Sequence, residues 1–141
     1  GEQDNFSIGR ATQLRSGNDV TIITPGTMMY EGMTASDILR KEHKINARVL
    51  QMASIKPIDR EAILKAAEET GYIVTVEEHN ILGGLGGAVC EIVAEVGRAK
   101  VVRLGIKDHF CGVGSQACLF GQEGLTVENL VKTVQSLTNG K

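Results

Sequence analysis

The segment Thr75-Val-Glu-Glu-His-Asn-Ile-Leu-Gly-Gly-Leu-Gly-Gly-Ala-Val89 connects a short apolar run to a glycine-rich turn and then to a helical repeat. Residues 72–76 are mostly β-branched and apolar, which is typical of a strand buried on both faces of a parallel sheet. From Leu85 onward the apolar residues recur at helical spacing, and Gly97 stands where a C-terminal cap is expected. The segment therefore predicts a strand, a loop and a helix.

Four polar residues, Glu77, Glu78, His79 and Asn80, follow the predicted strand. In open α/β sheets, ligands and partners meet the loops after the carboxyl ends of the strands, so these residues occupy the favoured edge. Beside carboxylates, the imidazole of His79 could act as a general base or bind a phosphate. The alternative is a histidine that serves an interface or caps the loop, and the absence of an evident nucleophile or partner acid favours it.

Composition predicts one compact domain that needs no membrane. The chain has 141 residues, 42% hydrophobic content and a formal charge of -2, as expected of an ordinary globular core. No run approaches the roughly 18 apolar residues of a membrane span, and the polar start is not a signal peptide. We therefore expect a cytoplasmic protein. Its Lys and Arg residues are scattered, so nucleic acid is not an expected partner.

Strand and helix signals alternate along the chain. Strands are predicted at 20–24, 47–52, 72–76 and 100–105, and helices at about 28–42, 59–70, 86–96, 115–120 and from 126 onward. Asp59 is the expected N-cap of the second helix. Such alternation predicts a mostly parallel sheet covered on both faces, a three-layer α/β/α sandwich. Residues 6–14 read either as an extra edge strand or as a linker.

The cysteines predict reduced thiols rather than disulfides. Cys90, Cys111 and Cys118 form no C-x-x-C pair, and their number is odd. A metal site would recruit His109, Cys111 and Cys118, but this spacing fits no common zinc pattern. No metal ligand is therefore predicted.

The loop after residue 105 holds two further motifs. Asp108 and His109 could orient one another as a catalytic dyad does; alternatively, Asp108 and Ser115 satisfy the backbone of the loop. Residues 112–117 match the dinucleotide fingerprint G-x-G-x-x-A, but they begin several residues after their strand ends. We therefore do not expect a nucleotide cofactor there.

Several motifs in one order give a more specific signal than any single residue. They are Phe6-Ser-Ile-Gly-Arg-Ala11, Gly17-Asn-Asp-Val-Thr-Ile-Ile23, Ala47-Arg-Val49, Ile55-Lys-Pro-Ile-Asp59, Glu77-Glu-His79, Gly83-Gly-Leu-Gly86, Gly105-Ile-Lys-Asp-His-Phe110 and Gly124-Leu-Thr126. Over nearly its whole length the sequence resembles the C-terminal domain of transketolase. It is especially similar to the C-terminal section of bacterial and archaeal transketolases that are split over two chains.

The resemblance implies an enzyme that uses thiamine diphosphate and Mg²⁺ to move a two-carbon ketol unit between sugar phosphates. In the family, one domain binds the diphosphate and Mg²⁺, another binds the pyrimidine, and a third, matched here, completes the subunit. The family's Gly-Asp-Gly motif is absent, and the pyrimidine-domain glutamate has no counterpart. The chain is thus expected to hold no cofactor and no catalytic residue, and to be inactive alone. The family also implies a five-stranded sheet with one antiparallel strand.

The partners implied by the resemblance are the cofactor-binding domains of the same enzyme, in the same chain or in a separate subunit, within a homodimer. Glu78, His79, Asp108 and His109 are the interface candidates. Residues 1–16 would be an interdomain linker or edge strand, and residues 17–141 the domain itself. A start without Met, inside what resembles an interdomain segment, suggests a piece of a longer enzyme.

Three alternatives stay open. The 1-deoxy-xylulose-5-phosphate synthases and the β subunits of 2-oxo acid dehydrogenases carry similar third domains. Outside the family, the chain could be a stand-alone module that binds a nucleotide or an anion at the same sheet edge. A pyrimidine-type domain directly upstream would favour the enzyme over the module.

Overall fold

The computed structural model describes residues 7–139, which form one sheet between layers of helices. The strands are β1 (Ala11–Arg15), β2 (Val20–Thr24), β3 (Ala47–Met52), β4 (Tyr72–Asn80) and β5 (Lys100–Ile106). The helices are the 3₁₀ helix η1 (Gly26–Met28), α1 (Met29–His43), α2 (Arg60–Glu69), α3 (Leu85–Val96), α4 (Gln116–Glu123) and α5 (Val127–Thr138). Within residues 7–139, no helix combines the length and the apolar character that crossing a bilayer requires.

The sheet has five strands in the order β1-β3-β2-β4-β5. Strands β3, β2, β4 and β5 are parallel, whereas β1 runs antiparallel to β3, with Ala11 opposite Met52. The predicted five-stranded mixed sheet is therefore confirmed. The part of segment 6–14 that forms an edge strand begins at Ala11, and Phe6 lies outside the described residues.

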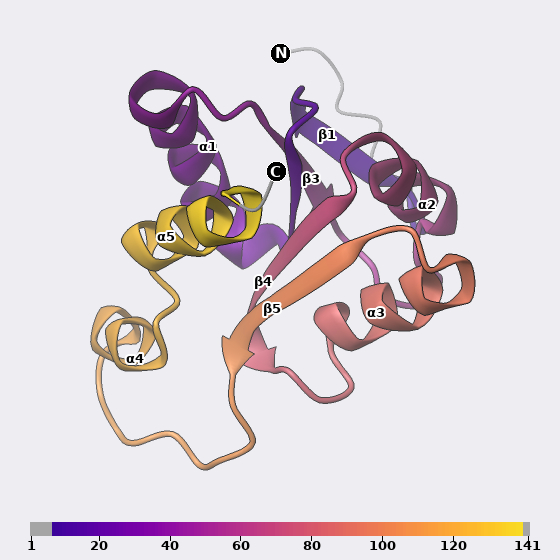
Figure 1. The fold of residues 1–141 in the computed structure, drawn as a ribbon. Coiled ribbons are helices and arrows are strands. Elements are labelled where there is room, and N and C mark those ends of the chain that lie inside the picture. Colours follow the sequence, from indigo (N-terminus) through magenta and orange to yellow (C-terminus); the bar gives the residue numbers. More distant parts are fainter. Residues whose placement is uncertain (1–6, 140–141) are drawn as a thin grey trace.

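Helices cover both faces of the sheet (Figure 1). Helices α1 and α5 pack on one face and α2 and α3 on the other, and each pair encloses its own apolar cluster. Ile22 and Ile23 show why β2 needs both layers, because neighbouring side chains of a strand point to opposite faces and both are fully buried. Helix α4 contributes no buried residue and lies beyond the sheet, next to the loop that follows β5.

Local sequence signals predicted most of the ends of helices and strands. Strands β2 and β3 have the predicted bounds, and the carboxylate of Asp59 caps α2 by accepting a hydrogen bond from the backbone N–H of Ala62. Two predicted ends were wrong. Strand β4 continues to Asn80 instead of ending at residue 76, because Asn80 pairs with Ile106 of β5 after an irregularity that follows Val76. The short helix predicted at 115–120 continues to Glu123, where Gly124 ends it at a positive φ.

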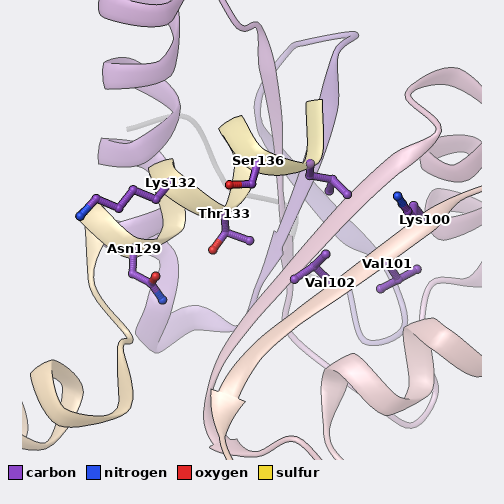
Figure 2. A pocket seen from close by; sticks show the side chains of 8 residues that line it. Lys100, Val101, Val102, Asn129, Lys132, Thr133 and Ser136 are labelled. Atoms are coloured by element: carbon purple, nitrogen blue, oxygen red, sulfur yellow. The ribbon is translucent and has the colours of Figure 1, made fainter. Parts of the chain in front are cut away.

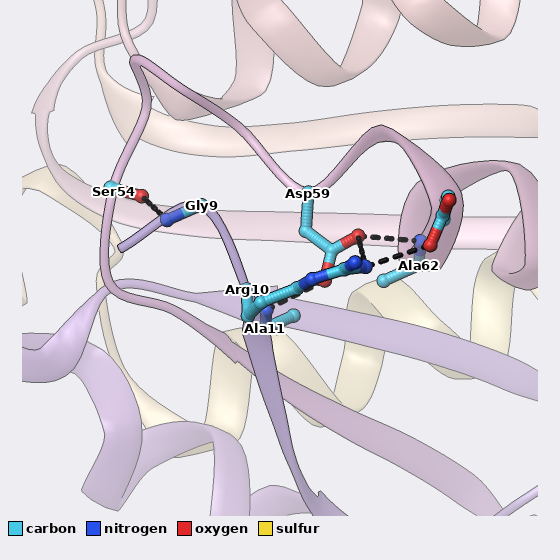
Figure 3. A network of polar contacts seen from close by, with 7 residues as sticks. Gly9, Arg10, Ala11, Ser54, Asp59 and Ala62 are labelled. Atoms are coloured by element: carbon cyan, nitrogen blue, oxygen red, sulfur yellow. Dashed lines mark hydrogen bonds and ion pairs between the residues drawn. The ribbon is translucent and has the colours of Figure 1, made fainter. Parts of the chain in front are cut away.

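Asp59 also fastens the edge strand to the body of the domain (Figure 3). Its Oδ2 accepts a hydrogen bond from the Ala11 backbone N–H at 2.8 Å, while its Oδ1 accepts the cap bond from Ala62 at 3.0 Å. The Gly9 N–H donates to Ser54 Oγ at 2.8 Å. One buried carboxylate therefore links the start of β1 to the start of α2.

The ion pair between Arg60 of α2 and Glu95 of α3 gives a pH-dependent prediction. The Arg60 guanidinium donates a hydrogen bond to the Glu95 carboxylate and holds its pKa below the usual range. A lowered folded pKa means that the pair stabilises the fold above the unfolded pKa of about 4.3, and that this stabilisation is lost as the pH falls through the folded pKa. In an NMR carboxyl titration, Arg60→Gln should raise the pKa of Glu95 toward its ordinary value.

Glu128 serves as the internal control of that titration. Its pKa is also lowered, but by Lys132 within α5, so Arg60→Gln should leave it unchanged. An identical pKa of Glu95 in both proteins would show that the ion pair does not form in solution.

Candidate functional site

The carboxyl edge of the sheet is organised around Glu77. Its side chain is buried, with the residue only 2% exposed, and it points at the start of α3. One carboxylate oxygen accepts the backbone N–H of Leu85 at 2.7 Å, and the other accepts that of Gly86 at 2.8 Å. The first N–H groups of a helix lack partners within the helix, so Glu77 satisfies two of them from the neighbouring strand. Its role is to fix the β4–α3 turn rather than to meet solvent.

Two glycines allow this turn to close around the carboxylate. A Cβ on Gly84 would lie 2.1 Å from Glu77 Oε2, and a Cβ on Gly105 would lie 2.9 Å from the carbonyl oxygen of His79. Arg103 completes the arrangement by donating from Nη1 to the Ile81 carbonyl at 2.8 Å. The glycine-rich turn noted in the sequence thus permits close backbone packing, not contact with a phosphate.

The polar candidates from β4 lie at this edge but take different roles. Glu78 Oε2 is buried and has no hydrogen-bond partner in the structure, whereas the ring of His79 is exposed. Both line a cavity of about 260 Å³ together with Pro25, Ile55 and Gly83. The Asn80 amide reaches across to the β5 loop and donates to Asp108 Oδ1 at 3.3 Å. The structure therefore brings Glu78 and His79 together, and it ties Asp108 to the end of β4.

His109 does not pair with Asp108. Its Nε2 lies 3.1 Å from Glu123 Oε2, and its Nδ1 lies 3.2 Å from the carbonyl oxygen of Phe110. The Phe110 carbonyl, followed by the Glu123 carboxylate, raises the pKa of the His109 imidazole above its usual value. The Asp108–His109 dyad considered from the sequence is absent, because Asp108 faces Asn80 and the partner of His109 is an acid fourteen residues later.

Exposed apolar side chains lie at the same edge of the sheet as these polar groups. Each belongs to a segment that follows the carboxyl end of a parallel strand, where Figure 1 shows the loops to α3 and α4 leaving the arrowheads of β4 and β5. They are Met29 and Tyr30 after β2, Ile55 after β3, Leu82 after β4, and Phe110 and Val113 after β5. Tyr30 is 72% exposed and Leu82 56%. Large apolar side chains gathered at one edge of a domain are typical of an interaction site or a ligand-binding groove.

The same edge does not suit a diphosphate. The start of α3 is where a helix would offer free N–H groups to an anion, but the Glu77 carboxylate already accepts those of Leu85 and Gly86. The nearby carboxylates of Glu78 and Asp108 would repel further negative charge. The described residues therefore do not fit the diphosphate of thiamine diphosphate, and no step of chemistry is assigned to this chain through that cofactor.

A second hollow lies away from this edge (Figure 2). It occupies about 480 Å³ between α5 and the first residues of β5, with Lys100 and Val102 on the strand and Asn129 and Thr133 on the helix. Its lining includes no carboxylate, thiol or imidazole. Its charged groups are the ammonium groups of Lys100 and Lys132.

Comparison with known proteins assigns the chain to a family. Residues 9–130 match the family model for the transketolase C-terminal domain. The chain is 46% identical over 134 residues to one subunit of the apulose-4-phosphate transketolase of Phocaeicola vulgatus, covering 94% of this chain and 42% of that relative. It is 41% identical over 139 residues to 1-deoxy-D-xylulose-5-phosphate synthase of Heliobacterium modesticaldum, covering 98% of this chain and 21% of that one.

A solved structure gives the same result. It is named a split-gene transketolase, inactive β4 tetramer, and it matches with a TM-score of 0.88 and 42% identity over 95% of this chain and 44% of that chain. The chain therefore spans about two fifths of the split relatives that it matches. On these matches the chain belongs to the transketolase family and comprises the family's C-terminal domain.

Proposed function

We propose that this domain is the non-catalytic third domain of a transketolase-type enzyme that transfers a two-carbon ketol unit between sugar phosphates. The other domains of the complete enzyme would hold thiamine diphosphate and Mg²⁺. The family match supports this proposal, as does the Glu77 carboxylate that occupies the α3 start. The solved split-gene relative is named an inactive β4 tetramer. That name agrees with a subunit that needs other domains for catalysis.

The observation that carries the proposal is the exposed apolar rim of the carboxyl edge. Its side chains come from the start of α1, which follows β2, and from the loops after β3, β4 and β5, which only the folded sheet brings together. The interface candidates Glu78, His79, Asp108 and His109 lie at the same edge, at the ends of β4 and β5. We infer that the cofactor-binding domains, in the same chain or in a separate subunit, pack against this edge within a homodimeric enzyme.

The proposal also covers the organisation and location of the chain. Residues 1–16 would lead from the preceding domain into the edge strand, and residues 17–141 would form the docking body. The three free cysteines support a cytoplasmic location, since disulfides are rare in that compartment. Neither nucleic acid nor a membrane is an expected partner.

A double substitution at the edge tests the docking surface. In the complete enzyme, Glu78→Ala with His79→Ala should weaken the association of the domains or subunits by about tenfold, a typical effect of truncating central interface side chains. Sedimentation at several concentrations would measure the association, and ketol transfer would be measured on the same samples. Unchanged association and turnover would contradict the proposed interface.

The matched control removes an exposed charged pair at the opposite edge. Arg98 Nη1 lies 3.3 Å from Glu68 Oε1 near the amino ends of the strands. Glu68→Ala with Arg98→Ala should leave both association and ketol transfer unchanged. A loss equal to that of the carboxyl-edge variant would mean that the effect is not specific to the edge.

The relatives favour a second candidate within the family. Identity of 41% to a 1-deoxy-D-xylulose-5-phosphate synthase is close to that of the split transketolases. The complete enzyme should therefore be assayed for 1-deoxy-D-xylulose 5-phosphate as well as for ketol transfer. Formation of the deoxy sugar without ketol transfer would replace the first candidate with the second.

A further inference from the structure

Three metal-ligating side chains meet between the β5 loop and α4. His109 and Cys111 belong to the loop, and Glu123 is the last residue of α4. The imidazole nitrogen, the thiol sulfur and a carboxylate oxygen of these residues lie within 4.8 Å of one another. They form a separate group from Glu77 and the β4–α3 turn. Of the three, His109 is also an interface candidate of the proposed docking edge, whereas Cys111 and Glu123 have no part in that proposal.

The separations resemble the edges of a tetrahedral zinc site. With Zn–N and Zn–O bonds of about 2.0–2.1 Å and a Zn–S bond of about 2.3 Å, ligand atoms lie about 3.3 Å apart for N and O and about 3.6 Å apart for S and O. In the structure, His109 Nε2 lies 3.1 Å from Glu123 Oε2 and Cys111 Sγ lies 3.7 Å from Glu123 Oε1. The Glu123 carboxylate thus already lies at ligand spacing from both the nitrogen and the sulfur, through a different oxygen for each. One of these oxygens would turn toward the ion on binding.

The hydrogen bond of the second ring nitrogen supports the same assignment. His109 Nδ1 lies 3.2 Å from the Phe110 carbonyl oxygen, to which it can only donate. Metal-binding histidines usually donate their other N–H to a carbonyl or a carboxylate, which leaves the free nitrogen pointing at the ion. Here that nitrogen, Nε2, faces the carboxylate of Glu123. Two lone pairs at this separation repel, so a cation must lie between them, either a proton or a metal ion.

The charge of the Glu123 carboxylate is compensated within the described residues by His109 and by the Cys111 thiol, which donates to Oε1. The Glu123 side chain is only 12% exposed, and within residues 7–139 its ion-pair partner is His109. It stands at the C-terminal end of α4, where the helix dipole disfavours a negative charge. A nearly buried carboxylate in that position is stabilised by a nearby cation.

We propose that His109 Nε2, Cys111 Sγ and the carboxylate of Glu123 bind Zn²⁺ or a similar thiophilic divalent cation, with water as the fourth ligand. The thiol and imidazole exclude Mg²⁺ and Ca²⁺, which take oxygen ligands. On binding, Cys111 releases its proton to solvent and bonds as the thiolate. The ion joins the β5 loop to α4, which otherwise contributes no buried residue.

Cys118 is not the fourth ligand, although the sequence places it nearby. It is exposed in the first turn of α4, where its backbone N–H donates to Ser115 Oγ. Helix geometry places it about 140° around α4 from Glu123. The metal grouping considered from the sequence, with two cysteines, thus takes Glu123 in place of Cys118.

Cobalt substitution of the reduced 141-residue chain tests the site. Co²⁺ should bind at one ion per chain, with a thiolate-to-cobalt charge-transfer band and the intense visible bands of four-coordinate cobalt, and Zn²⁺ should displace it. Cys111→Ser should abolish the charge-transfer band and weaken Zn²⁺ binding, measured by chelator competition, by about 100-fold or more. Even partners outside the ligand set change metal affinity by about 10- to 100-fold.

Matched variants separate this site from adventitious binding. Cys118→Ser and His79→Gln should bind Co²⁺ and Zn²⁺ as the unchanged chain does, whereas His109→Asn, at a half-exposed side chain whose loss should not unfold the domain, should lose the site. Saturable binding that survives both Cys111→Ser and His109→Asn, or that disappears with Cys118→Ser, would overturn the proposal. So would the absence of saturable Co²⁺ binding by the reduced chain. None of these results depends on enzyme activity.

Discussion

Replacing Glu77 with Gln is expected to destabilise the domain by about 2–4 kcal/mol. The carboxylate accepts two backbone N–H groups, those of Leu85 and Gly86, in a buried position. An amide offers one oxygen, and its NH₂ group would face the second backbone N–H as one donor against another. A buried polar group left without a partner costs about 1–3 kcal/mol. The Gln side chain cannot move away, because the backbone at Gly84 lies against it.

Denaturant unfolding monitored by circular dichroism would measure the Glu77 effect. Glu91→Gln is the matched control, because Glu91 is an exposed residue of α3, and an exposed change of this kind should stay within about 0.5 kcal/mol. A Glu77→Gln protein as stable as the Glu91→Gln protein would show that the carboxylate does not fix the start of α3.

The second large effect is expected at Asp59. Asp59→Ala removes the N-cap of α2, worth about 0.5–2 kcal/mol, and leaves the Ala11 N–H of β1 without its acceptor. An unpaired N–H of this kind adds about 1–3 kcal/mol, so the total loss should be about 1.5–5 kcal/mol. Asp59→Asn should lose less, because its single amide oxygen can still accept one of the two bonds.

Hydrogen exchange separates the two roles of Asp59. The Ala11 amide should lose protection in Asp59→Ala, along with a fall in the global unfolding free energy. Asp37→Ala provides the control, because the half-exposed Asp37 carboxylate forms a surface ion pair with Arg15 at 3.4 Å. Loss of such a pair should lower the unfolding free energy by less than about 1 kcal/mol. Equal stability of Asp59→Ala and Asp37→Ala would contradict a linking role for Asp59.

Local chemistry explains what the sequence predicted well. Asp59 and Thr126 cap helices through bonds to residues three positions later, and Gly97 ends a helix by taking a positive φ, so neighbouring residues suffice to identify these boundaries. The end of β4 could not be found this way. Residues 77–80 look like a polar loop, but pairing with β5 keeps them in the strand.

The candidate site was harder to predict because its pairings are long-range. Glu77 and His79 are close in the sequence, yet the first is buried under α3 and the second is exposed. The signal for Glu77 was an acid at a strand end before a glycine-rich helix start, which also fits a ligand edge. His109 pairs with Glu123, which lies beyond the rest of the loop and the whole of α4. No sequence motif predicts contact between residues at this separation.

Ketol transfer by the chain alone, and by the chain together with its cofactor-binding domains, tests the central claim most directly. The assay supplies a ketose phosphate donor, an aldose phosphate acceptor, thiamine diphosphate and Mg²⁺. We predict no transfer by the 141-residue chain and transfer once the other domains are present. Transfer by the chain alone would contradict a non-catalytic role, and no transfer by the complete enzyme would contradict its assignment as a transketolase.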